Sequence, residues 1–194
     1  MCRPSNKIKM TLVVLAGGGS RRMGTDKTRI SVAGRTLLDH VLNQVRDRFG
    51  EILISVSPDS PSEVSGFPSV RDERSGFGPM EGIRRGLERA AHETCFILAC
   101  DIPDIDFGLV ERLLRNSGHT DITVPVSPDG TVEPLFGVYK QRVWTEAERL
   151  LSQGRRSVLA LHDALRTIHI PITAEEKLLN LNTLADVKHY LSAR

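Results

Sequence analysis

The chain has 194 residues, 40% of them hydrophobic, a size and composition that suit one domain with a substantial core. Its 26 basic and 24 acidic residues are interspersed and leave a formal net charge of +2, which argues against a nucleic-acid-binding protein. No apolar stretch approaches the length of a membrane span. We therefore predict one domain over residues 10–194, and we expect it to contact neither nucleic acid nor membrane.

The first nine residues are polar and basic, and we predict that residues 1–9 form a disordered extension, with Met1 and Met10 both open as the start. The apolar run that follows is about half the length of a signal-peptide core and leads straight into a glycine-rich turn, so we expect no export. The cysteines Cys2, Cys95 and Cys100 match neither a disulfide framework nor a metal-ligand spacing, which favours the reducing cytoplasm.

The first predicted element is a buried strand over residues 11–16, and a glycine turn with several cations follows it. Glycines let backbone N–H groups approach a ligand, and Arg21, Arg22 and Lys27 can offset the charge of phosphate oxygens. A P-loop is excluded because Gly24 is not followed by Lys and then Ser or Thr, and a dinucleotide fingerprint is excluded because Arg22 stands in place of its third glycine. The turn therefore predicts a nucleoside triphosphate site of another kind.

Strands and helices alternate along the next hundred residues. We predict strands at 51–57, 69–71, 95–99 and 122–126, a helix after the N-cap Thr36, and a helix from Pro79 to about His92. Beyond them the pattern is looser, with a strand near 135–139 and helices near 143–153, after Arg156 and over 183–191. This alternation predicts an α/β fold with a mostly parallel sheet covered by helices on both faces.

Three polar residues follow apolar runs and should meet at the carboxyl edge of that sheet, where open α/β folds bind ligands: Asp72, Asp101 and Asn180. Asp101 ends a uniformly apolar strand, so its carboxylate is a candidate ligand for Mg²⁺ shared with phosphate oxygens. The alternative is an aspartate that caps the following turn, the role that we also expect of Asp104 and Asp106.

The glycine-rich stretch from Leu15 to Lys27 resembles the signature of the nucleotidyltransferase superfamily, and in detail that of the molybdenum cofactor guanylyltransferases, the MobA family. Four further stretches resemble this family in the same order: residues 78–82, 100–103, 133–139 and 179–183. The resemblance implies a three-layer Rossmann-like nucleotidyltransferase fold.

The resemblance also implies roles at the nucleotide. Arg22 would hold the leaving pyrophosphate, Lys27 would contact the α-phosphate region, and Asp101 would bind Mg²⁺, which makes these three the candidate catalytic residues. Ser57 stands where family members tend to have asparagine. For Asp72 the alternative to a nucleotide contact is an ordinary surface charge, and for Arg21 the alternative to a phosphate contact is a solvated loop arginine. The implied nucleotide-binding set is Leu15, Ala16, Gly17, Gly18, Lys27, Ser57, Asp72 and Asp101.

For the acceptor, the resemblance implies contacts with a molybdopterin phosphate from Gly78, Gly82, Arg156, Asn180 and Asn182. Gly82 can alternatively serve close helix packing, and the neighbouring Arg155 can be solvated. Glu81 does not fit, because the family usually has a small residue there and a carboxylate at a helix start repels phosphate unless it points away.

The function implied is Mg²⁺-dependent transfer of GMP from GTP to molybdopterin in the cytoplasm, with pyrophosphate released. Two alternatives stay open: a cytidylyltransferase or a sugar- or polyol-phosphate nucleotidyltransferase, and a non-catalytic protein that carries nucleotide or cofactor. Transient contact with molybdoenzymes or cofactor-delivery proteins is a further expectation.

Overall fold

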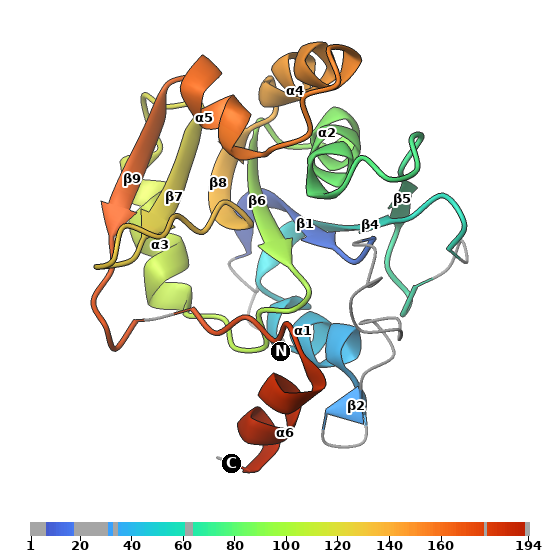
Figure 1. The fold of residues 1–194 in the computed structure, drawn as a ribbon, viewed down its shortest axis with the longest axis vertical. Helices are drawn as coiled ribbons and strands as arrows, with labels where there is room; N and C mark the ends of the chain where they lie inside the picture. The colour runs from blue at the N-terminus through green and yellow to red at the C-terminus, as the bar shows by residue number, and fades with distance from the viewer. Residues whose placement is uncertain (1–6, 18–30, 33–34, 61–63, 177, 193–194) are drawn as a thin grey trace, which may run out of the picture.

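The computed structural model describes residues 7–17, 31–32, 35–60, 64–176 and 178–192 (Figure 1). In chain order the described elements are β1 (Ile8–Leu15), β2 (Ser31–Val32), β3 (Arg35–Thr36), α1 (Leu37–Val45), β4 (Phe49–Val56), β5 (Ser69–Arg71), α2 (Pro79–Arg89), β6 (Thr94–Ala99), α3 (Phe107–Asn116), β7 (Ile122–Val126), β8 (Phe136–Lys140), α4 (Val143–Ser152), α5 (Leu159–Ala164), β9 (Thr167–Pro171) and α6 (Leu184–Ser192).

The main sheet of the described residues has seven strands in the order β5-β4-β1-β6-β8-β7-β9, and β2 pairs with β3 in a small separate ribbon. Neighbouring strands are parallel except that β8 runs antiparallel to both β6 and β7. The predicted α/β class with a mostly parallel sheet is confirmed. Ile8 and Lys9, which we assigned to the extension, form the first two residues of β1.

Helices cover both faces of the sheet, as predicted for three layers (Figure 1). Side chains alternate between the faces along each strand, so Leu12 and Val14 of β1 pack with α1 and α3, whereas Val13 and Leu15 pack with α2 and α4. Two apolar cores therefore hold one rigid sheet between them, and the ends of its strands are fixed in space.

Local signals set the helix boundaries. The Thr36 side chain accepts a hydrogen bond from Asp39 N at 3.1 Å and caps α1 as predicted. Asp106 caps α3 in the same way, accepting from Leu109 N at 3.1 Å. Helix α2 begins at Pro79 behind Gly78, whose positive φ of 70° favours glycine, and it ends at Arg89, three residues before the expected end.

Helix α2 packs unusually close to β1 and β4. A Cβ atom on Gly86 would lie 2.4 Å from Val13 Cγ1, and one on Gly82 would lie 2.5 Å from Ser55 Oγ. Gly82 thus has the packing role weighed as its alternative, and its contact with an acceptor stays a prediction.

We expect Gly86→Ala to lower the free energy of unfolding by roughly 1 kcal/mol. Alanine favours a helix by about 1 kcal/mol over glycine, but overpacking a core costs about 1–3 kcal/mol, and the steric term should prevail. Chemical denaturation measures the change. Gly118→Ala is the control, because a Cβ there meets nothing within 4 Å, and a Gly86 variant as stable as this control would contradict the prediction.

The segment before α6 passes beneath the end of β6 (Figure 1), and Leu181 N donates to Asp101 O at 2.8 Å. Its apolar anchor is a small cluster of Leu37, Leu181, Val187 and Tyr190. The chain's last described helix therefore fixes Asn180 beside the carboxyl edge of the sheet.

Within the part of the chain that the structure describes, every helix falls short of what a membrane span requires.

Candidate functional site at the carboxyl edge of the sheet

The glycine turn begins where β1 and β4 end side by side. Ala16 N donates to Ser55 O at 2.8 Å, and the Ser57 hydroxyl donates to Gly17 O at 2.8 Å. A Cβ on Gly17 would lie 2.8 Å from Ser57 N, so only glycine permits this approach. Leu15, Ala16, Gly17 and Ser57 are thus brought together as predicted, and Ser57 anchors the start of the turn.

The cationic part of the turn lies outside the described residues. This holds for Gly18, Arg21, Arg22 and Lys27. Their roles at the triphosphate stay predictions from the sequence.

Asp72 follows β5 at the same edge. Its N–H donates to Val56 O at 2.9 Å, and its Oδ1 accepts from the Ser55 hydroxyl at 3.3 Å. Burial raises the pKa of Asp72 to about 7; the Ser55 hydrogen bond opposes this shift and the charge of Glu81 adds to it. Asp72 is therefore a half-buried group at the carboxyl edge of the sheet, not an ordinary surface charge.

We expect Asp72 to make folding stability depend on pH between about 4 and 7. Because its pKa is raised from 3.8 to about 7, the folded protein holds this proton more tightly than the unfolded chain. Its contribution is complete below pH 4 and is lost as the pH rises through 7. Melting temperatures at pH 5, 6, 7 and 8 should fall more for the wild type than for Asp72→Asn. Asp59→Asn, at an exposed position, should keep the wild-type profile, and identical profiles for all three would refute the assignment.

Asp101 lies two residues past β6, next to the start of the glycine turn. Cys100 N donates to Leu15 O at 3.2 Å, which joins the ends of β6 and β1. Asp101 O accepts from Leu181 N, so Asn180 also belongs to this edge. The predicted meeting of Asp101, Asn180 and the start of the turn is present in the structure.

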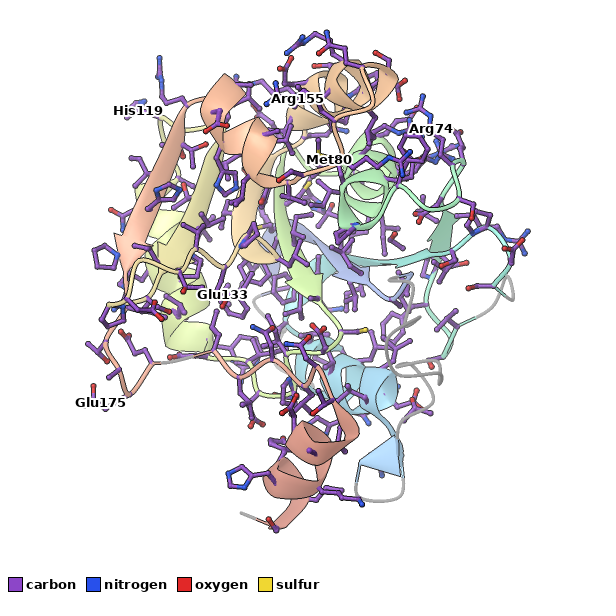
Figure 2. The ribbon with its side chains drawn as sticks, in the orientation of Figure 1. Arg74, Met80, His119, Glu133, Arg155 and Glu175 are labelled. Atoms are coloured by element: carbon purple, nitrogen blue, oxygen red, sulfur yellow. The ribbon has the colours of Figure 1, made fainter. Side chains whose placement is uncertain are left out.

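Glu133 is a site residue that the sequence analysis missed. Asn180 Nδ2 donates to its Oε2 at 3.2 Å, and Figure 2 shows Glu133 below β8, near the segment that leads to α6. Burial raises the pKa of Glu133; the Asn180 hydrogen bond opposes the shift, and the charge of Asp101 adds to it. Two carboxyl groups and an amide therefore share the edge, although the described residues contain no group of three or more His, Cys, Asp and Glu side chains placed to hold a metal ion.

The misfit at Glu81 is resolved by a buried ion pair. Glu81 is fully buried, and its carboxylate accepts from Arg84 Nε at 3.0 Å and Arg84 Nη2 at 2.9 Å. It also accepts from Glu73 N at 3.1 Å, which ties down the loop behind Asp72. Although burial acts to raise the pKa of Glu81, the hydrogen bonds from Arg84 and Glu73 lower it overall. Its charge is neutralised inside the protein and does not oppose a phosphate at Gly78.

The remaining acceptor candidates are spread out. Arg156 lies over the Phe77 ring at 4.3 Å and donates to Gly76 O at 3.2 Å, so it borders the loop before α2. Arg155 is exposed beside α4 and lies well apart from Glu133 (Figure 2). Asn182 is exposed, and its N–H donates to Asp186 Oδ2 at 2.8 Å. The structure joins Asn180, but not Arg155, to the edge around Asp101.

The chain is similar to known proteins in sequence and in structure. A family model described as the MobA-like NTP transferase domain matches residues 12–167. A Mycobacterium marinum protein named probable molybdenum cofactor guanylyltransferase is 33% identical over 190 residues, covering 95% of this chain and 94% of the relative.

Two solved structures confirm the predicted fold. Molybdopterin-guanine dinucleotide biosynthesis protein A from Archaeoglobus fulgidus has a TM-score of 0.81 at 24% identity, covering 95% of this chain and 98% of that one. The 2-C-methyl-D-erythritol 4-phosphate cytidylyltransferase from Thermus thermophilus has a TM-score of 0.71 at 20% identity, covering 96% and 98%. Because a guanine- and a cytidine-named protein share this fold, the fold alone does not select the base.

Proposed function

We propose, because the chain belongs to the MobA-like NTP transferase family, that it transfers GMP from GTP to the terminal phosphate of molybdopterin. A phosphate oxygen of the acceptor attacks the α-phosphorus, the bond to the β-phosphate oxygen breaks, and pyrophosphate leaves. The acceptor is already ionised, so positioning and charge stabilisation carry the catalysis and no strong base is needed. We place this reaction in the cytoplasm and expect transient contact with the proteins that receive the product.

One observation supports the proposal above the others: Asp101 and the start of the glycine turn lie together at one edge. The bond from Cys100 N to Leu15 O holds the two strand ends in register. A triphosphate gripped by Arg22 and Lys27 on that turn would present its α-phosphate toward Asp101. Asp101, with oxygen donors from its neighbours, would hold a Mg²⁺ ion, which supplies charge neutralisation at the phosphates.

The nucleotide base is assigned to the ends of β1 and β4. Backbone groups of Leu15, Ala16 and Gly17 would satisfy its polar edge there, and Asp72 would contact the sugar or base. The Ser57 hydroxyl already donates to Gly17 O, so Ser57 would act by shaping this backbone. GTP is favoured over CTP by the name of the 33% identical relative.

The test has two parts. With Mg²⁺ present, GTP should raise the melting temperature more than CTP does, and a preference for CTP would replace guanylyl by cytidylyl transfer. With GTP and molybdopterin supplied together, pyrophosphate should be released. Binding of GTP without pyrophosphate release would instead support a carrier protein.

A further inference from the structure

A hollow of about 240 Å³ adjoins Glu133 at the carboxyl edge. It lies between the connection from β7 to β8 and the segment that follows β9, so β6 separates it from the ends of β1 and β4. Its volume is just below the roughly 300–1,000 Å³ of pockets for drug-sized ligands, which suits a single ring system. Its lining residues are Ser127, Pro128, Asp129, Thr131, Glu133, Ala174 and Leu178.

Hydrogen bonds hold the walls of this hollow in place. Ser127 N donates to Thr131 O at 2.9 Å, and Thr131 N donates to Asp129 Oδ1 at 2.9 Å. Glu133 N donates to Pro125 O at 3.1 Å, and on the opposite wall Ile172 N donates to Val126 O at 3.0 Å. Both walls are thus tied to β7, and the hollow is preformed.

The lining combines apolar surface with a fixed carboxyl group. Pro128, Ala174 and Leu178 offer apolar contacts for the faces of a flat ring. Glu133 is half-buried, and the hydrogen bond from Asn180 to its Oε2 fixes the orientation of its carboxyl group. Such a carboxyl group recognises a planar heterocycle that carries adjacent N–H donors.

We propose that this hollow binds the pterin ring of the acceptor, with the Glu133 carboxylate accepting hydrogen bonds from the ring's 2-amino group and adjacent N3–H. The inference rests on the proposed function, because molybdopterin supplies the ring. The order β1-β6-β8-β7 then places nucleotide, Asp101 and pterin in sequence along one edge, with the reacting phosphates between the two rings. Guanine has the same donor edge, so the two ring sites must be separated by experiment.

The probe is 6-hydroxymethylpterin, a fluorescent pterin that lacks the phosphate. The wild-type protein should bind it saturably, and Glu133→Gln should weaken binding at least tenfold, because an amide nitrogen would face the ring's donors. Glutamine keeps the shape of the side chain and an oxygen for Asn180, so the fold should persist. The matched control is Glu175→Gln, an exposed position on the outer end of the segment after β9 (Figure 2), which should bind like the wild type.

The outcomes separate this inference from the proposed function. Saturating GTP should leave pterin binding intact, whereas competition by GTP would assign the pterin to the base site and overturn the inference. Undiminished binding by Glu133→Gln, or no binding by the wild type, would also overturn it, even if GMP transfer proceeds. Absence of GMP transfer together with Glu133-dependent pterin binding would instead refute only the proposed reaction.

Discussion

Asp101→Ala is expected to lower kcat for GMP transfer by about 1,000-fold while the protein stays folded. Removing a ligand of a catalytic cation forfeits several kcal/mol of charge stabilisation, and each 1.36 kcal/mol is a factor of ten in rate. The fold should survive because Asp101 joins the C-terminal segment through its main-chain oxygen, which accepts from Leu181 N and is unchanged in alanine. Pyrophosphate release measures the rate, and circular dichroism checks the fold.

The matched control for Asp101 is Asp163→Ala. Asp163 is an exposed carboxylate on α5, which leads into the first residue of β9 and so lies at the amino edge of the sheet. Its removal changes the net charge equally and should leave kcat within about twofold. A folded Asp101 variant with kcat close to that of this control would remove Asp101 from the catalytic machinery.

The central strands were predictable because parallel strands buried on both faces are continuous apolar runs. This describes the runs at 11–15 and 95–99, which became β1 and β6. Strand β9 was missed for the opposite reason. It pairs only with β7 among the described strands, and Ile168 and His169 are exposed, so no apolar run marks it. Its pairing partner β7 lies 45 residues earlier in the chain, too far away for local periodicity to reveal the pairing.

Glu133 shows why a search for polar residues directly after apolar runs finds only part of the site. Asp72 and Asp101 were found because each follows an apolar run, and parallel strands bring such positions to one edge. Strand β8 is antiparallel, so its beginning, not its end, lies at that edge. Glu133 precedes the first residue of β8, so a search for polar residues that follow apolar runs does not select it. If the antiparallel direction of β8 were known, the residues that precede this strand would be candidates for the site, and Glu133 is one of them.

The sequence shows that Glu81 stands where the family usually has a small residue, but it does not show where the Glu81 carboxylate points. The spacing of Glu81 and Arg84 permits an i,i+3 pair, yet most such pairs are solvated. Burial of both groups depends on the contact of α2 with α4 and β5, which local sequence does not encode. The structure adds what decides the chemistry, namely that this carboxylate faces Arg84 and the Glu73 N–H instead of the helix start.

Glu81→Ala is expected to lower the free energy of unfolding by about 3 kcal/mol. Arg84 is only 4% exposed and would lose the carboxylate that holds its Nε and Nη2, and breaking a buried pair costs about 3–5 kcal/mol. The lower end applies because Arg84 keeps ion pairs with Glu73, Glu88 and Glu148. Glu73 N also loses its acceptor, so the loop beside Asp72 should loosen and the KM for GTP should rise. Urea denaturation and initial rates measure the two effects.

A matched pair elsewhere isolates burial as the cause. Glu146 and Arg149 have the same i,i+3 spacing on α4, but Arg149 is 51% exposed, so Glu146→Ala should leave the free energy of unfolding close to that of the wild type. The double variant Glu81→Leu with Arg84→Met removes both charges, and it should regain much of the stability because no unpaired cation remains buried. If the double variant is as unstable as Glu81→Ala, the cost comes from the lost bond to Glu73 N. In that case Glu81 stabilises the fold through the hydrogen bond that it accepts from Glu73 N, which holds the loop behind Asp72, and not through its ion pair with Arg84.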